Sequence, residues 1–364
     1  MTERSGFASA VGWGLFCSAS WTWCIGMFLP FIMLERYGWP GFWIFFVPNV
    51  VGCASFGLLQ STERVRALRE RLLPMCGWFS LVTILYQAFF AGWMLPSLSG
   101  LAVVIAGLLC ARLLGERAWL WMSLIVAIAT AAAVATHVSG AASPRTEAHG
   151  SLPSGDLIAL APAIALGFLA CPFLDLTFHR ARLRSGSRAS FAVFGVAFAF
   201  TLLGIAMWWS DALRGPVRDG ALVALWCGQL AFTIGAHARE GSAPLVDGLA
   251  RPAMLTPLSA VWAALSGLAL GWAVRLAPEG FANAGEWAYL ALLGFYGLVF
   301  PFALLLRRRL PAPVLIAFIV AALPFYAKAF IGGRTGYLWG PILALAVLLM
   351  ATSDKQMAKG LPAT

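Results

Sequence analysis

Hydroxyl side chains lie in the middle of the first apolar segment, residues 6–30. Ser18, Ser20 and Thr22 are followed by Pro30 near the far end of that segment. A span that only anchors a protein would be filled with Leu, Val and Ile. Polar groups beside a helix breaker indicate a helix that opens and exposes its carbonyls. Hydroxyl and carbonyl oxygens are the ligands that hard cations prefer. The alternative is that these hydroxyls bond back to their own helix or bridge close-packed helices.

Asp175 is the one carboxylate well inside an apolar run. Ionisable groups at such positions are costly and often functional, so Asp175 is a candidate proton site. The alternative is a simple ion pair, because His179 and Arg182 follow on the next turns.

Aromatic and amide side chains in three segments are suited to binding a solute. Trp21 and Trp23 lie in the first segment, Tyr86 and Gln87 in the third, and Phe173 in the sixth. An aromatic wall with one amide suits a small polar or zwitterionic molecule. Ordinary aromatic packing is the alternative for each residue.

Catalytic and metal-binding patterns are missing from the sequence. There is no HExxH, no GxSxG and no P-loop, and the seven cysteines form no CxxC pair. We therefore expect no enzyme activity and no metal site, and we interpret the cysteines as packing residues.

The elements that carry these residues are membrane-spanning helices. The chain is 61% hydrophobic and 11% charged, against roughly 25% charged in soluble domains, and its mean hydropathy is +0.84. Apolar runs of about 20 residues recur along it. The sequence predicts an all-α polytopic membrane protein with about 12 spans, at 8–34, 40–60, 74–96, 98–115, 118–138, 154–178, 190–210, 220–238, 252–275, 286–306, 312–331 and 336–352.

The basic residues predict the orientation. With a cytoplasmic N-terminus, 18 of the 25 Lys and Arg residues lie on the inside and 7 on the outside. We therefore expect both termini in the cytoplasm, an even number of spans and a bacterial inner membrane. The net charge of +10 follows from membrane insertion, so the expected partner is the lipid bilayer and not nucleic acid.

A Ser-, Pro- and Gly-rich stretch divides the chain. We interpret 139–153 as an external linker between a first five-helix repeat, 1–138, and a second, inverted repeat, 154–306. Residues 307–364 then supply two extra helices and a cytoplasmic tail. Pro30 and Pro172 lie late in the first and sixth spans and are the predicted helix breaks.

Several stretches resemble the sodium/solute symporter family. Residues 17–43 (CSASWTWCIGMFLPFIMLERYGWPGFW) resemble the start of the family's transport core, with its Ser-rich helix and "IGM"-like turn. Residues 79–101, 165–190 and 293–309 resemble its third, sixth and tenth core helices. The resemblance implies a LeuT-like fold, a 5+5 inverted repeat whose first and sixth helices are broken.

The resemblance also implies an ion site. The carbonyls of Phe16 and Ala19, with Ser20 beside them and Thr233 on the eighth helix, would bind Na⁺. The family carries a Ser/Thr cluster on that helix, whereas here Gln229 and Thr233 are the only candidates. The expected coupling ion is therefore Na⁺ or H⁺, with no other cofactor.

Together these features predict a secondary active transporter that moves a small polar solute by alternating access with a coupled cation. One alternative is a carrier of the drug/metabolite-transporter type, which residues 108–134 resemble at a Gly-Glu junction. Another is a transporter-like subunit or sensor without transport activity, bound to a protein partner. The symporter fold predicts unwound backbone at 19–23 and 170–173. The drug/metabolite fold predicts continuous helices there, and a non-transporting subunit predicts a sealed core.

Overall fold

The computed structural model describes residues 6–139, 150–153, 155–208, 220–242, 250–278 and 283–357. Within these ranges the secondary structure is helical, with no strand. Ten of the described helices are long and apolar enough to cross a membrane. The prediction of a polytopic helical membrane protein is thereby confirmed at the level of its class.

The first half of the chain forms six α-helices, several of them interrupted. They are α1 (Phe7–Trp21), α2 (Cys24–Val47), α3 (Cys53–Leu59), α4 (Thr62–Met94), α5 (Ser97–Leu113) and α6 (Glu116–Ser139), with a π-helical turn η1 (Pro48–Gly52) joining α2 to α3. Gly38 inside α2 has a φ of 65° and a ψ of −161°. This backbone conformation is open only to glycine at little cost, and it bends the chain between the first two predicted spans.

The second half begins after the predicted linker. Its elements are α7 (Asp156–Ala170), the 3₁₀ turn η2 (Cys171–Phe173), α8 (Leu176–Ser185), α9 (Ala189–Trp208), α10 (Gly220–Arg239), α11 (Pro257–Arg275), α12 (Ala284–Gly294), the π-helical turn η4 (Phe295–Val299), α13 (Phe300–Leu306), α14 (Ala312–Phe330), the 3₁₀ turn η5 (Thr335–Leu338) and α15 (Trp339–Met357). Most of the predicted linker, 140–149, and the last residues of the tail, 358–364, lie outside the described residues.

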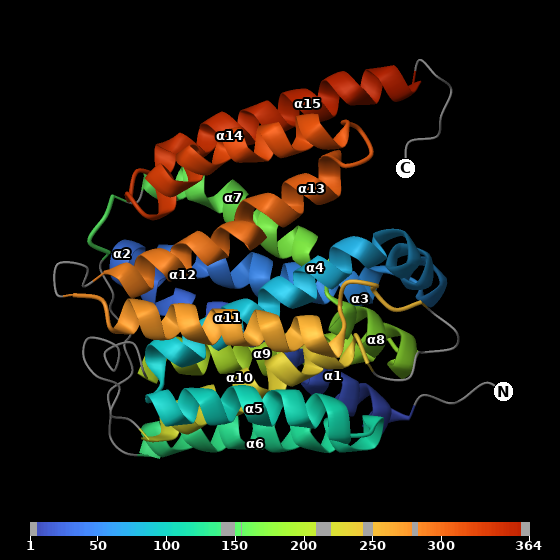
Figure 1. Ribbon diagram of the computed structural model, residues 1–364, viewed down its shortest axis with the longest axis vertical. Helices are drawn as coiled ribbons and strands as arrows, with labels where there is room; N and C mark the ends of the chain where they lie inside the picture. The colour runs from blue at the N-terminus through green and yellow to red at the C-terminus, as the bar shows by residue number, and fades with distance from the viewer. Residues whose placement is uncertain are drawn as a thin grey trace.

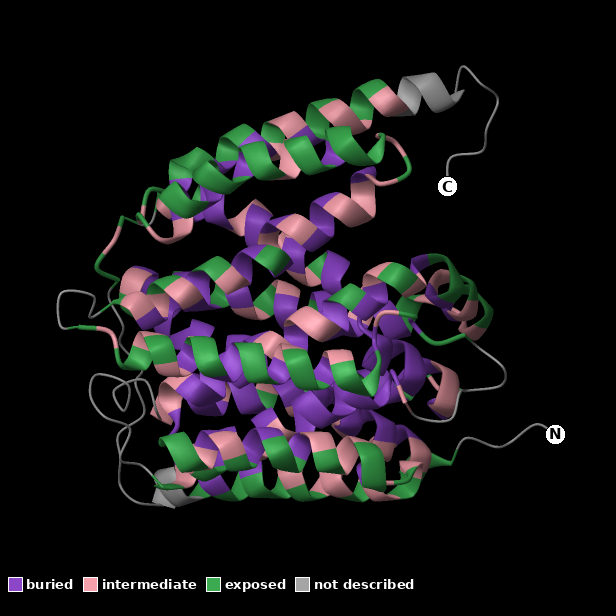
Figure 2. Ribbon diagram, viewed as in Figure 1, coloured by how far each residue is buried: buried purple, intermediate pink, exposed green. Residues whose placement is uncertain are grey.

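The helices lie side by side, with α5 and α6 along one flank and α14 and α15 along the other (Figure 1). Helix α1 begins and α15 ends at the same end of the bundle. Buried residues gather in the middle, whereas α5, α6, α14 and α15 carry many exposed residues (Figure 2). Among these are large apolar side chains such as Trp121, Ile125 and Val347. Exposed apolar surface of this kind is suited to a lipid bilayer.

Close contact between α4 and α11 fixes one side of the core. A Cβ atom added at Gly267 would overlap the carbonyl oxygen of Leu85, and one at Gly271 would overlap that of Phe89. Small residues let membrane helices approach until their backbones touch, and dispersion then holds them. Helix α4 is thereby held rigidly beside the interrupted helices.

Candidate functional site

Two helices are interrupted in the middle of the bundle. Helix α1 ends at Trp21, and Thr22 and Trp23 have ψ angles of 66° and 175° before α2 begins at Cys24. Helix α7 ends at Ala170, and α8 begins only after the 3₁₀ turn and Asp175, whose ψ is 108°. The two breaks meet through a 3.0 Å hydrogen bond between Ser20 Oγ and Thr177 Oγ1.

The prolines predicted to break these helices behave differently. Pro172 lies in the 3₁₀ turn of the second break. Pro30 does not mark the first break, because α2 continues through it with helical backbone. The fixed φ of proline suits a helix, and neighbouring helices can compensate for its missing N–H in a membrane bundle. The first interruption therefore lies earlier in the chain, at Thr22 and Trp23.

The carbonyls freed at the end of α1 are hydrogen-bonded. Thr233 Oγ1 of α10 donates to Ala19 O at 3.3 Å, and Thr22 Oγ1 donates to Ser18 O at 2.7 Å. Trp23 Nε1 donates to Ser20 O. Of the predicted ion ligands, Ala19, Ser20 and Thr233 are brought together. Phe16 lies one turn earlier, and its ring packs against that of Phe232 at 5.6 Å.

Gln87 and two tyrosines hold the beginning of α2. Cys24 N donates to Gln87 Oε1 at 3.0 Å, and Tyr289 Oη donates to Cys24 O at 3.1 Å. Tyr86 Oη in turn donates to Tyr289 O at 2.9 Å. Tyr86 and Gln87, predicted to line a solute site, therefore support the break from α4.

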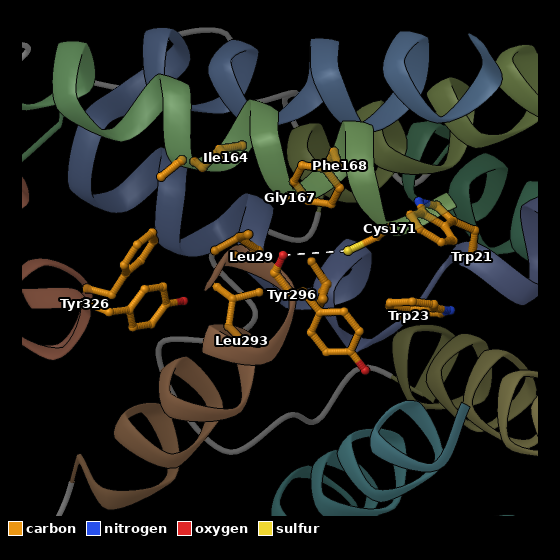
Figure 3. Close-up of a pocket in the computed structure, with 14 residues that line it drawn as sticks. Trp21, Trp23, Leu29, Ile164, Gly167, Phe168, Cys171, Leu293, Tyr296 and Tyr326 are labelled. Carbon is orange, nitrogen blue, oxygen red and sulfur yellow. Dashed lines mark hydrogen bonds between the residues drawn. The ribbon is translucent and has the colours of Figure 1, made fainter. Parts of the chain in front are cut away.

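A cavity of about 30 Å³ lies between the two breaks (Figure 3). Trp21 and Trp23 line it, as predicted for the solute site, together with Cys171, Tyr296 and Tyr326. Cys171 Sγ donates to Tyr296 O at 3.6 Å across it. Such a space has room for only about two water molecules. No sequence pattern pointed to Tyr326, whereas Tyr296 falls within the segment that resembles the tenth core helix.

Phe173 lies away from this cavity. Its ring packs edge-on against that of Phe56, with centroids 5.3 Å apart. It lines a separate groove of about 360 Å³ that also contains Arg71 and Arg308.

Asp175 caps the beginning of α8 and is fully buried. Its Oδ1 accepts hydrogen bonds of 2.7 Å from both the N–H and the hydroxyl of Thr177. The predicted alternative of an ion pair with His179 or Arg182 is not found. His179 Nε2 lies 2.9 Å from Phe173 O, and Arg182 donates to Gln60 O. A side chain at the N-cap turns back toward the helix start, so residues on later turns do not reach it.

His237 of α10 faces Asp175 instead. Its Nε2 atom lies 3.9 Å from Asp175 Oδ2, and both side chains are fully buried. Its Nδ1 atom lies 3.2 Å from Ser80 Oγ of α4. His237 was not among the residues predicted from the sequence, although it lies four positions after Thr233 and so on the same face of that helix.

A buried charge network adjoins this pair on the side where α1 begins. The Glu240 carboxylate lies between two arginines. It pairs with Arg180 Nε of α8, and Arg69 Nη1 of α4 lies 3.7 Å from Glu240 Oε2. Burial alone raises the pKa of Glu240, but the guanidinium groups of Arg180 and Arg69 outweigh that effect and lower the pKa below its usual value. Arg180 also lies 3.8 Å from Glu116, which is 33% exposed.

In the described part of the chain no three His, Cys, Asp or Glu side chains come together as metal ligands. No protein-family model matches the chain, and no curated protein matches it significantly. The site is therefore interpreted from its own chemistry.

Proposed function

We propose that this protein is a secondary active transporter of a small polar solute, coupled to a cation and working by alternating access. The observation that carries the proposal is the pair of helix breaks around one cavity. We also propose a LeuT-like arrangement of twelve spans in a bacterial inner membrane, with both termini in the cytoplasm.

The hydrogen bonds at the breaks support this proposal. An unpaired backbone group inside a bilayer costs several kcal/mol, so an interruption persists only where other groups satisfy it. Here the partners are Gln87 of α4 and Thr233 of α10, which come from other helices. Alternating access requires the broken segments to move relative to α4 and α10, and hydrogen bonds between separate helices are ones that such a movement can break and re-form.

The breaks also favour this fold over the drug/metabolite type. That alternative predicts continuous helices at 19–23 and 170–173, and both stretches are interrupted. If α1 with α2 up to Gly38 is one broken span and α7 with α8 is its counterpart, the described helices group into twelve spans.

One observation favours a second candidate, a transporter-like subunit or sensor bound to a protein partner. The cavity of about 30 Å³ has room for only about two water molecules, too little for a polar organic solute. A transporter in a closed state and a permanently sealed subunit both have such a core, so they differ only in whether it opens.

The cavity contains its own reporter of opening. Cys171 lines it, whereas Cys17 is buried in α1 and does not. Two variants would each keep one of these cysteines, with the other six replaced by alanine. Alkylation by a membrane-impermeant maleimide would be followed in inside-out and right-side-out vesicles.

A transporter predicts that Cys171 is alkylated from both sides and that Cys17 is alkylated from neither. A solute that binds would slow the reaction of Cys171. Protection of Cys171 from both sides over the whole experiment would contradict transport and favour the sealed subunit, whose partner should then copurify.

A further inference from the structure

The pair formed by Asp175 and His237 has two polar atoms without hydrogen-bond partners. Asp175 Oδ2 and His237 Nε2 are both fully buried, and neither makes a hydrogen bond. They face each other across 3.9 Å, about 1 Å more than a charge-assisted hydrogen bond between these atoms. Buried polar groups are normally paired, so two facing exceptions point to a ligand or proton that changes their state.

The surroundings hold both side chains in place. Thr177 fixes Asp175 Oδ1 with two hydrogen bonds, and Ser80 lies next to His237 Nδ1. The rings of Trp23 and Phe79 flank the imidazole, with centroids 5.7 and 6.3 Å from it. Only the facing atoms are free to change partners.

The chemistry of the pair favours a proton over a sodium ion. Sodium is a hard cation that takes several oxygen ligands. Asp175 Oδ2 faces a nitrogen atom, and the nearby carbonyls of Ser18, Ala19 and Ser20 already accept hydrogen bonds. A carboxyl group and an imidazole are the two side chains that hold and pass protons near neutral pH.

Other titratable groups lie near Asp175 on the elements packed around it. They are Cys17 of α1, Cys53 of α3, Cys76 of α4, Cys171 of η2, His179 of α8, Tyr296 of η4 and Glu240 after α10. Thiols and phenols ordinarily titrate above about pH 8, and Glu240 is paired with two arginines. Asp175, His237 and His179 are therefore the groups that can change charge here between about pH 5 and about pH 8. Of these, Asp175 and His237 face each other, whereas His179 contacts Phe173 O.

The pair has charged groups on one side and the central cavity on the other. Glu240 lies three residues after His237, and its partner Arg180 lies 3.8 Å from the partly exposed Glu116. Glu116 lines a pocket of about 330 Å³ with Arg112, Arg184 and Arg239. Trp23 lines the central cavity, and its ring lies 5.7 Å from that of His237.

We propose that Asp175 and His237 together bind one exchangeable proton, which is the coupling ion of this protein. The proton resides on the Asp175 carboxyl, and when it leaves, the carboxylate turns to His237 Nε2–H as its hydrogen-bond donor. The role of this proton in coupling rests on the transport function proposed above. Proton binding itself can be measured without any solute.

The test is an infrared pH titration of the reconstituted protein, which follows the C=O band of a protonated carboxyl group. Asp175→Asn and Asp175→Ser remove the carboxyl and keep an N-cap for α8. Asp156→Asn, at the first turn of α7, is the matched control. We expect a band that titrates between about pH 5 and about pH 8 in the wild type and in Asp156→Asn, and is absent from both Asp175 variants.

His237→Leu tests the second member of the pair. Without the imidazole, the carboxylate loses its facing N–H donor, so the midpoint should rise by about one pH unit, a tenfold change in proton affinity. Replacing choline chloride with sodium chloride in the buffer should leave the midpoint of the wild-type titration unchanged.

Three results would overturn the inference: no titrating band that depends on Asp175, a midpoint unaffected by His237→Leu, or displacement of the proton by sodium. Each leaves the transport proposal standing, because that proposal is judged by access to Cys171. Permanent protection of Cys171 would conversely leave the proton site standing without a coupling role.

Discussion

Replacing Glu240 with glutamine should strongly destabilise the protein. Its carboxylate is 1% exposed, and the side chains of its partners Arg180 and Arg69 are 2% and 4% exposed. The substitution leaves two buried guanidinium groups without their shared counter-charge. Removing one partner of a buried ion pair typically costs about 3–5 kcal/mol, which corresponds to a folding equilibrium changed by more than about a hundredfold.

The chain offers a matched control at the other end of the bundle. Arg36 and Glu286 form an Arg–Glu pair at 2.5 Å, but their side chains are 24% and 33% exposed. Water screens this pair, so Glu286→Gln should cost only about 0–1 kcal/mol. The two substitutions make the same chemical change and differ in burial.

The assay is equilibrium unfolding of the detergent-solubilised protein, followed by tryptophan fluorescence. The double variant Glu240→Gln/Arg180→Gln should be more stable than the sum of its single changes predicts, because it removes a charge that Glu240→Gln leaves unpaired. If Glu240→Gln destabilises no more than Glu286→Gln, the network does not stabilise this fold as its burial implies.

The same network predicts a pH dependence. The pKa of Glu240 is lowered in the folded protein, so its contribution is complete above the unfolded pKa, about 4.3, and is lost as the pH falls through the folded value. Wild-type stability should decrease on acidification in that range. The Glu240→Gln variant should lack this part of the decrease. If stability falls by the same amount in both proteins on acidification, Glu240 is not the group responsible.

Three further substitutions test the supports of the site by the same unfolding assay. Gly271→Ala should destabilise by about 1–3 kcal/mol, because the new methyl group overlaps a carbonyl of α4. Gly228→Ala should be neutral or slightly stabilising, because the new methyl group meets only a Val126 methyl, at 4.0 Å. Equal effects of the two substitutions would contradict the close approach of α4 and α11. Thr256→Ala removes the capping box of α11 and should cost about 1 kcal/mol, a loss that Thr256→Ser should not show. Gln87→Leu removes the acceptor at the start of α2 and should cost about 1–3 kcal/mol; a cost no larger than that of Thr256→Ser would refute this role.

The sequence by itself determined the class of the fold. Apolar runs separated by short basic loops indicate membrane helices, because the bilayer excludes unpaired backbone groups and charge. Most predicted spans coincide with observed helices, since composition and helix length are local properties. The hydroxyls at 18–22 likewise pointed to the segment where α1 stops.

The tertiary structure decided which side chains meet. Sequence proximity suggested His179 and Arg182 as partners of Asp175, yet its facing group is His237, 62 positions away. The residue type of Pro30 likewise predicted a helix break there, although α2 runs through it. Glu240 is likewise absent from the sequence-based assignments and lies at the centre of the buried charges.

The physical reason is the range over which each effect acts. Hydropathy and helix periodicity depend on residues that are close together in the sequence, so a single sequence reveals them. Contacts between α4, α8 and α10 depend on how helix faces pack, and packing is settled only when all the helices are assembled.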